Sequence, residues 1–426
     1  MGKMEKLTIK SIAPDNIPRS AKLFLAGMTV SGLGDGIIMV VAQLYAISLG
    51  FGSTSLGNVF MLKFMATALL TIPSGVLADR YGRFKVLASG LIIFSVGMLL
   101  LLTARTVELF GLSMIMIGLA DATFVMLGPM YSSFFDNGDM DRAFGLQMFL
   151  NVLAISIGSL LGFVPPMLVR SLGLTIEASY WTMMVVATVL FFTRAAFFLL
   201  SARGAVEFRR EGGFRFRLES KGVVSKFVLL SIIGNIGFSV FFSLQAYYAN
   251  SKFGAQSDAL GFLAFVSCLV QALASIAAPK LSGRLGTTRT IALSLGLSAP
   301  FYFMLSQVPD FTWFSAFAIL RLGIANLASP LNSSLYMRLI SPEEKATASS
   351  ITHTISRLSI ALATWLGGRI MVTSLDLPIY LGAGLYVIYA VAYFLLLRNE
   401  ESRRQRVATT VYEAPGLIPV GSDPKR

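Results

Sequence analysis

The chain has 426 residues; 55% are hydrophobic, only 13% are charged, and the formal net charge is +13. Soluble proteins carry about 25% charged residues, so this composition excludes a soluble enzyme, a disordered chain and a nucleic-acid-binding domain. The length fits twelve membrane spans of ~22 residues with short loops between them. We therefore expect an all-α polytopic membrane protein, embedded in the lipid bilayer and without a nucleic-acid partner.

Residues suited to metal or redox chemistry are too few to form a site. The sequence has one cysteine, Cys268, and one histidine, His353, which excludes an internal disulfide and most zinc sites. It also lacks the G-x-x-x-x-G-K-[ST] loop of ATP-binding proteins. We expect no metal, no cofactor and no enzymatic activity.

Long apolar stretches set the expected helices. Backbone polar groups inside a bilayer must be satisfied within the segment, so stretches of this length are expected to be helical. The predicted helices cover residues 23–48, 56–78, 85–104, 109–134, 144–169, 178–201, 226–249, 258–281, 288–307, 311–335, 347–374 and 377–397.

The basic residues of the loops predict the orientation. Most of the 35 Lys and Arg fall in the N-terminal tail, the C-terminal tail and the loops on the same side of the membrane. Lys and Arg accumulate in cytoplasmic loops, so we expect both termini in the cytoplasm and the protein in the cell membrane. The first apolar stretch is too long for the core of a signal peptide and is expected to be retained.

The order of the segments suggests a duplicated architecture of two pseudo-symmetric six-helix lobes. A charged linker, residues 202–225, separates the lobes 23–201 and 226–398, and tails of residues 1–22 and 399–426 flank them. Two short passages echo between the halves: LADRYGRFK against LSGRLGTTR, and GPMYSS against SPLNSS. Such repeats are common in transporters. We expect a monomer.

The most specific motif is the loop between the second and third predicted helices, GVLADRYGRFKVL, which begins at Gly75. It resembles the signature loop of the major facilitator superfamily, with Phe84 at a position where the family usually has a base. The resemblance implies a latch that joins the two lobes in the outward-facing state. Its residues here are Gly75, Asp79, Arg80, Gly82 and Arg83. In the second copy Gly283 replaces the acid, so the latch is one-sided.

The same resemblance implies that the first, fourth, seventh and tenth helices line a central cavity. Helix five of many proton-driven drug exporters of the family carries a proline after its glycine pair. Here Gly158 and Gly162 have the glycine spacing, but no proline follows at that place. The pair by itself predicts close helix packing.

Two acids lie near the middle of predicted helices. A charge inside a bilayer costs several kcal/mol and calls for a function or a partner. Asp35 lies in helix one and Asp121 in helix four. Several proton-coupled sugar symporters of the family carry acids on these two helices, and this resemblance implies that Asp35 and Asp121 carry protons. The alternative is that each belongs to a structural ion pair.

Opposite charges lie in the second half. Arg321 and Arg357 are placed to hold an anionic substrate or to neutralise the two acids across the cavity. The equal numbers of acids and arginines favour the pairing role. His353 lies one turn before Arg357 on the same face. Candidates without charge for substrate contact are Asn235 and Asn326. Two further cations, Lys63 and Arg194, are expected to extend along their helices to the membrane interface.

We interpret the sequence as a secondary active transporter that moves a small organic solute by alternating access, with H⁺ as the coupling ion. The polar residues of the expected cavity favour symport of a small polar solute. A proton-driven exporter of drugs or metabolites is the alternative, with aromatic residues in a permissive cavity. A transporter-like sensor is a third possibility, although the C-terminal tail is short for a signalling domain.

Overall fold

The structure is a computed structural model that describes residues 17–135, 140–201, 220–340 and 344–413. The predicted tail 1–22, linker 202–225 and tail 399–426 therefore lie partly outside the described residues. The helices of the first half are α2 (Arg19–Ser48), α3 (Ser53–Tyr81), α4 (Arg83–Thr103), α5 (Val107–Thr123), η1 (Phe124–Met126), α6 (Leu127–Ser132), α7 (Met140–Leu160), η2 (Leu161–Phe163), α8 (Val164–Leu172) and α9 (Ile176–Ser201).

The helices of the second half are α10 (Lys221–Phe242), α11 (Gln245–Phe253), α12 (Ser257–Leu285), α13 (Thr287–Met304), α14 (Phe311–Asn326), α15 (Ala328–Leu339), α16 (Lys345–Thr373) and α17 (Leu377–Glu413). They confirm the prediction of an all-α, 12-helix membrane protein. By length and composition, 11 of the described spans can cross a membrane. The remaining span, α13, is shorter and less apolar, with Thr and Arg in its first turn.

Two predicted boundaries differ from the structure. Helix α10 begins at Lys221, inside the segment assigned to the linker, and α17 continues to Glu413, beyond the predicted end of the second lobe. The α10 extension precedes an apolar stretch and the polar α17 extension follows one, so the hydropathy criterion ends where the helical backbone does not. A helix that leaves the bilayer can continue in water.

Four spans are interrupted. Short 3-10 segments separate α5 from α6 and α7 from α8, while Ser243–Leu244 and Leu327 separate α10 from α11 and α14 from α15. The breaks in the fourth and tenth spans lie before Pro129 and Pro330, the echo noted in the sequence. The turns at Gly82 and Gly286 also match, with φ of 100° and 86°. These corresponding turns agree with the predicted repeat.

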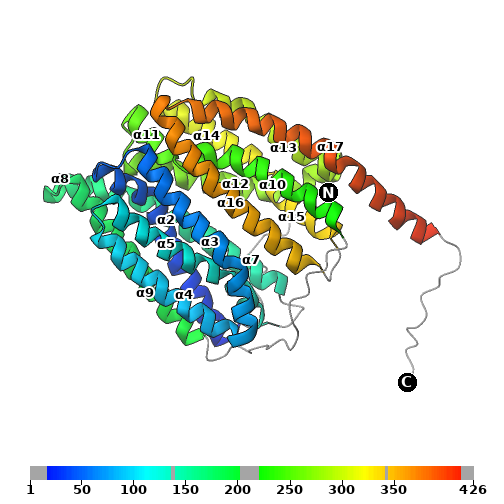
Figure 1. Cartoon of the computed structure of the whole chain (residues 1–426), viewed down its shortest axis with the longest axis horizontal. Coiled ribbons are helices and arrows are strands. Elements are labelled where there is room, and N and C mark those ends of the chain that lie inside the picture. The colour runs from blue at the N-terminus through cyan, green and yellow to red at the C-terminus, as the bar shows by residue number, and fades with distance from the viewer. Residues whose placement is uncertain (1–16, 136–139, 202–219, 341–343, 414–426) are drawn as a thin grey trace, which may run out of the picture.

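The helices of each half pack on one another, and the two groups lie side by side (Figure 1). Glycines allow the backbones to touch. A Cβ at Gly36 of α2, or at Gly158 of α7, would overlap the backbone of the opposite helix. Gly158 thus has the packing role that its spacing predicted.

The two lobes meet on one side of the membrane. We call the side with the turns at Gly50 and Gly254 the far side, and the side with Gly82 and Gly286 the tail side. On the far side α3 touches α16, where a Cβ at Gly57 would lie 3.0 Å from the Cα of Gly368. The two helices run side by side through the middle of the molecule (Figure 1).

A second far-side contact joins the fifth and eighth spans. A Cβ at Gly162 would overlap the backbone oxygen of Ser257, and one at Gly261 would overlap that of Ser159. Towards the tail side, by contrast, a Cβ at Gly75 would have no heavy atom within 4 Å. The lobes are therefore in backbone contact on the far side.

One glutamine bridges the lobes at the break between α10 and α11. Gln43 of α2 donates its Nε2 to the backbone oxygen of Ser243 at 2.8 Å, and its Oε1 accepts from the backbone N–H of Tyr247 at 3.3 Å. The helix break exposes these backbone groups, and the amide of Gln43 satisfies both.

Replacing Gln43 by Leu is expected to weaken far-side closure by about 1–2 kcal/mol, because two hydrogen bonds between the lobes are lost. Spin labels on Glu108→Cys and Gln256→Cys, both exposed on the far side, measure the distance between the lobes in a Cys268→Ser background. The open population should rise by about tenfold. Gln307→Leu is the control, because Gln307 bonds Ser306 and Tyr380 inside one lobe. An unchanged distance distribution in Gln43→Leu would contradict this role.

Candidate functional site

Three cavities adjoin one another, one in each lobe and one between the lobes. The N-lobe cavity of about 360 Å³ contains Asp35 and Asp121. A central cavity of about 280 Å³ shares Met39 and Gln43 with it. The C-lobe cavity of about 610 Å³ shares Phe238 with the central one. The site predicted at the centre of the molecule is thus divided into three adjoining compartments.

Asp121 forms an ion pair with Lys63, whose Nζ lies 3.2 Å from its Oδ2. Gly118 makes this possible: it lies one turn before Asp121, and a Cβ there would overlap the backbone oxygen of Lys63. Thr67 reinforces the contact by donating to the Gly118 oxygen at 3.0 Å. Lys63 therefore points into the N-lobe cavity, and the prediction that it extends to the interface was wrong.

Asp35 is connected to Arg194 through a hydroxyl. Arg194 Nη1 donates to Ser31 Oγ at 3.1 Å, and Ser31 Oγ donates to Asp35 Oδ2 at 3.2 Å. Arg194 is 4% exposed, and its guanidinium lies 4.5 Å from the centre of the Phe94 ring and 4.9 Å from that of Phe191. The prediction that Arg194 reaches the interface was also wrong, because α9 directs it into the lobe.

The pairing of acids and arginines across the lobes is absent among the described residues. Both acids have cations of their own lobe, Lys63 and Arg194. Arg321 is fully buried, its Nε and Nη2 have no hydrogen-bond partner in the described chain, and four aromatic rings surround it. Its guanidinium lies 4.3 to 5.2 Å from the ring centres of Phe238, Phe242, Tyr302 and Tyr386.

The sequence placed Arg321 in the middle of its helix, but it did not predict the aromatic rings that surround the guanidinium. Phe238 and Phe242 are one turn apart on α10 and stack at 4.9 Å, while the two tyrosines come from α13 and α17. Cations over aromatic faces gain about 2 kcal/mol or more when desolvated. The enclosure thus offsets part of the cost of burying this charge.

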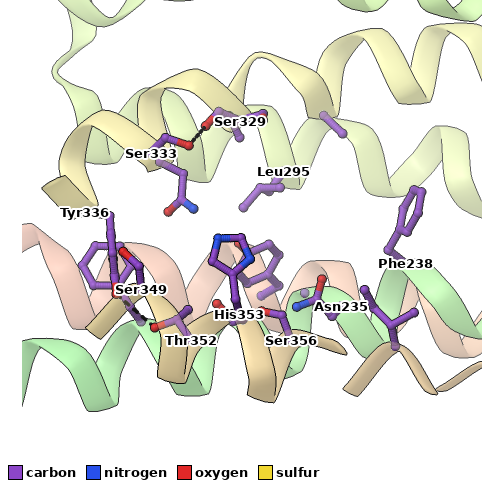
Figure 2. A pocket seen from close by; sticks show the side chains of 18 of the residues that line it. Asn235, Phe238, Leu295, Ser329, Ser333, Tyr336, Ser349, Thr352, His353 and Ser356 are labelled. Carbon is purple, nitrogen blue, oxygen red and sulfur yellow. Dashed lines mark hydrogen bonds between the residues drawn. The ribbon is translucent and has the colours of Figure 1, made fainter. Parts of the chain in front are cut away.

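The C-lobe cavity brings together three of the predicted residues. His353 and Arg357 of α16 and Asn235 of α10 all line it. Figure 2 shows His353 pointing into the space between α15 and α16, with Asn235 and Ser356 beside it and Ser329 and Ser333 opposite. The spacing of His353 and Arg357 on one helix face was sufficient to predict that they share a compartment.

Asn326 lies elsewhere. Its Nδ2 donates to the backbone oxygen of Gln271 at 2.9 Å and to Ser275 Oγ at 3.0 Å, both on α12. It does not line any of the three cavities described above. Asn326 therefore holds the interrupted tenth span against α12 in this structure, and its predicted role in substrate contact stays a prediction.

The predicted latch residues lie at the tail-side ends of α3 and α4. Asp79 and Arg80 are exposed, and Asp79 has no hydrogen bond or ion pair with any described residue. The guanidinium of Arg80 stacks over Tyr81, and Gly82 forms the turn to Arg83. A latch residue is expected to lack a partner when the two lobes are separated on the tail side. The latch role of Asp79 stays a prediction. No group of three or more metal-ligand side chains occurs among the described residues.

Comparison with known proteins agrees with this architecture. The sequence matches the profile of the Major Facilitator Superfamily over residues 24–247 and again over 227–421. The chain belongs to the major facilitator superfamily. It is therefore a secondary transporter of a small molecule, and not an enzyme.

Individual relatives are distant. Multidrug resistance protein 1 of Bacillus subtilis (strain 168) is 23% identical over 380 residues, which are 84% of this chain and 91% of that protein. The structure of the POT family transporter PepTSo superposes with a TM-score of 0.71 at 14% identity, covering 91% of this chain and 99% of that one. The nucleoside transporter NupG gives a TM-score of 0.68 at 14% identity, covering 91% and 100%. At these identities the structures share the fold.

Proposed function

We propose that this superfamily member exports lipophilic organic solutes, drugs or metabolites, in exchange for protons. The alternative in the sequence analysis thus replaces symport of a small polar solute as the main proposal. Two findings support the change: the similarity to a multidrug resistance protein, and the lining of the N-lobe cavity.

The observation that carries this proposal is the acid in an apolar compartment. Asp35 is exposed to a cavity that also contains the Lys63–Asp121 pair and whose other walls are mainly apolar. Seven of its lining residues are aromatic or methionine: Met39, Phe60, Phe64, Phe94, Met98, Met114 and Phe191. Methionine is flexible and polarizable and adapts to ligands of different shape. Aromatic faces attract organic cations. A lipophilic solute with a basic group fits such a compartment.

The charge pairs suggest how protons are coupled to export. With Asp35 ionised, the Ser31 bridge holds it near Arg194, and Asp121 holds Lys63. A proton bound to either carboxylate removes one negative charge from the cavity and weakens its attraction for a basic solute. The solute then leaves, and the neutralised carboxylate crosses to the other open state before it releases its proton.

The orientation is part of the proposal. With the termini in the cytoplasm, as the basic loops favour, the far-side contact closes the outer face and the tail side opens inward. The structure then corresponds to the state that loads solute from the cell. The cell membrane and a monomeric state are proposed with it.

The test is transport in proteoliposomes with an imposed pH gradient, using ethidium as a lipophilic cation. We expect ethidium to move against the proton flux, to stop when a protonophore collapses the gradient, and to stop in Asp35→Asn. Movement of solute in the same direction as the protons would support symport instead. Transport that persists without a gradient would overturn proton coupling.

A further inference from the structure

The charges of the two lobe cavities are not alike. In the N-lobe cavity each acid has a cation of its own lobe close by, so the charges balance. The C-lobe cavity contains no Asp or Glu among its lining residues, while Arg357 and His353 both face it. An organic cation can therefore approach two carboxylates in the N-lobe cavity, whereas the lining of the C-lobe cavity offers it none.

Arg357 is available for a ligand. Within the described part of the chain it makes no hydrogen bond or ion pair, although it lies about 18 Å along α16 from the helix start at Lys345. Its neighbours Asn235, His353 and Ser356 also have no side-chain hydrogen bond to a described residue. Arg357 is exposed to the cavity, so its guanidinium N–H groups are accessible to an anion that enters. Together these side chains supply several hydrogen-bond donors that an anion in the cavity can use.

A second cation strengthens the positive field of this cavity. Arg321 lies behind Tyr386 and Phe238, and both of these side chains line the C-lobe cavity. Its fully buried guanidinium has two nitrogens without a hydrogen-bond partner among the described residues. Aromatic rings offset its burial but do not cancel its charge. The field of Arg321 therefore adds to that of Arg357.

We propose that the C-lobe cavity binds an anionic group of the solute, a carboxylate or a phosphate ester, with Arg357 as the bidentate donor. Asn235 and Ser356 complete the site with an amide and a hydroxyl. The proposal rests on the proposed export function and specifies which of its solutes bind most tightly: those with an anionic part in addition to the basic, lipophilic part. The volume of about 610 Å³ is typical of pockets for molecules of drug size.

Two matched probes test this. Rhodamine B is a zwitterion, and its ethyl ester is the same lipophilic cation with the carboxylate masked. Binding is measured on the purified full chain in detergent without a pH gradient, by fluorescence anisotropy. Rhodamine B should bind about tenfold more tightly than the ester, because of one bidentate charge-assisted pair. Arg357→Gln should remove this preference, and Arg357→Lys should restore it in part.

The control is Arg369→Gln, on the same helix but stacked over Trp365 and outside all three cavities. It should keep the preference. Equal binding of the two probes, or a preference that survives Arg357→Gln, overturns the proposal. A lipid-headgroup site would also overturn it. In that case phosphatidylglycerol abolishes the preference for rhodamine B, and it stabilises the wild type but not Arg357→Gln. Since no transport is involved, binding can succeed or fail independently of the export function.

Discussion

Replacing Asp35 by Asn is expected to reduce proton-driven transport to background and to destabilise the protein by roughly 3 kcal/mol. The loss of stability arises because Arg194, which is 4% exposed, keeps its charge after its counter-charge is gone. An uncompensated buried charge costs about 3–5 kcal/mol, and the indirect link to the exposed Asp35 carboxylate places this case at the low end. The chain of contacts from Arg194 through Ser31 to Asp35 is the basis of this estimate. Thermal unfolding and transport are measured on the same preparation.

A second variant separates the two effects. Asp35→Asn with Arg194→Gln removes both charges and is expected to recover most of the stability while transport stays at background. Asp310→Asn is the control, since Asp310 caps α14 away from the cavities and Asn is an equally good cap. If the double variant regains transport together with stability, Asp35 is a structural partner and does not carry the proton.

Replacing Gly368 by Val is expected to abolish transport by preventing closure of the far side. A Cβ at Gly368 would lie 2.5 Å from the backbone oxygen of Ser53 and 2.9 Å from the Cα of Gly57. Backbone atoms on both sides have no room to yield, so α3 and α16 must separate. The cost exceeds the few kcal/mol that divide the conformations of a transporter.

Spin labels measure that separation directly. The far-side pair at Glu108 and Gln256 should lengthen in Gly368→Val, and a tail-side pair at Tyr81 and Leu285 should shorten as the lobes rock. Gly384→Val on α17 is the control, because a Cβ there meets no heavy atom within 4 Å. Wild-type distances and transport in Gly368→Val would show that the glycine contact does not govern the exchange.

The sequence was sufficient to predict how deep the acids of the candidate site lie in the membrane, but not which cations pair with them. The positions of Asp35 and Asp121 within apolar stretches were enough to place both acids inside the bilayer, and both line the N-lobe cavity. Their cations were misassigned. Lys63 and Arg194 stand two turns from a membrane face in the sequence, which favours the interface, yet both side chains turn inward.

The sequence by itself determined the twelve spans, the motif at Gly82 and the duplicated order, because apolar length and turn chemistry are local properties of the chain. It determined how deep each charge lies along its helix. Only the tertiary structure decided which way each helix faces, because that rotation is fixed by packing against other helices. Gly118 brings α5 onto α3 beside Lys63, and thereby selects Lys63 as the partner of Asp121. The aromatic rings around Arg321 come from three helices, and no local pattern relates them.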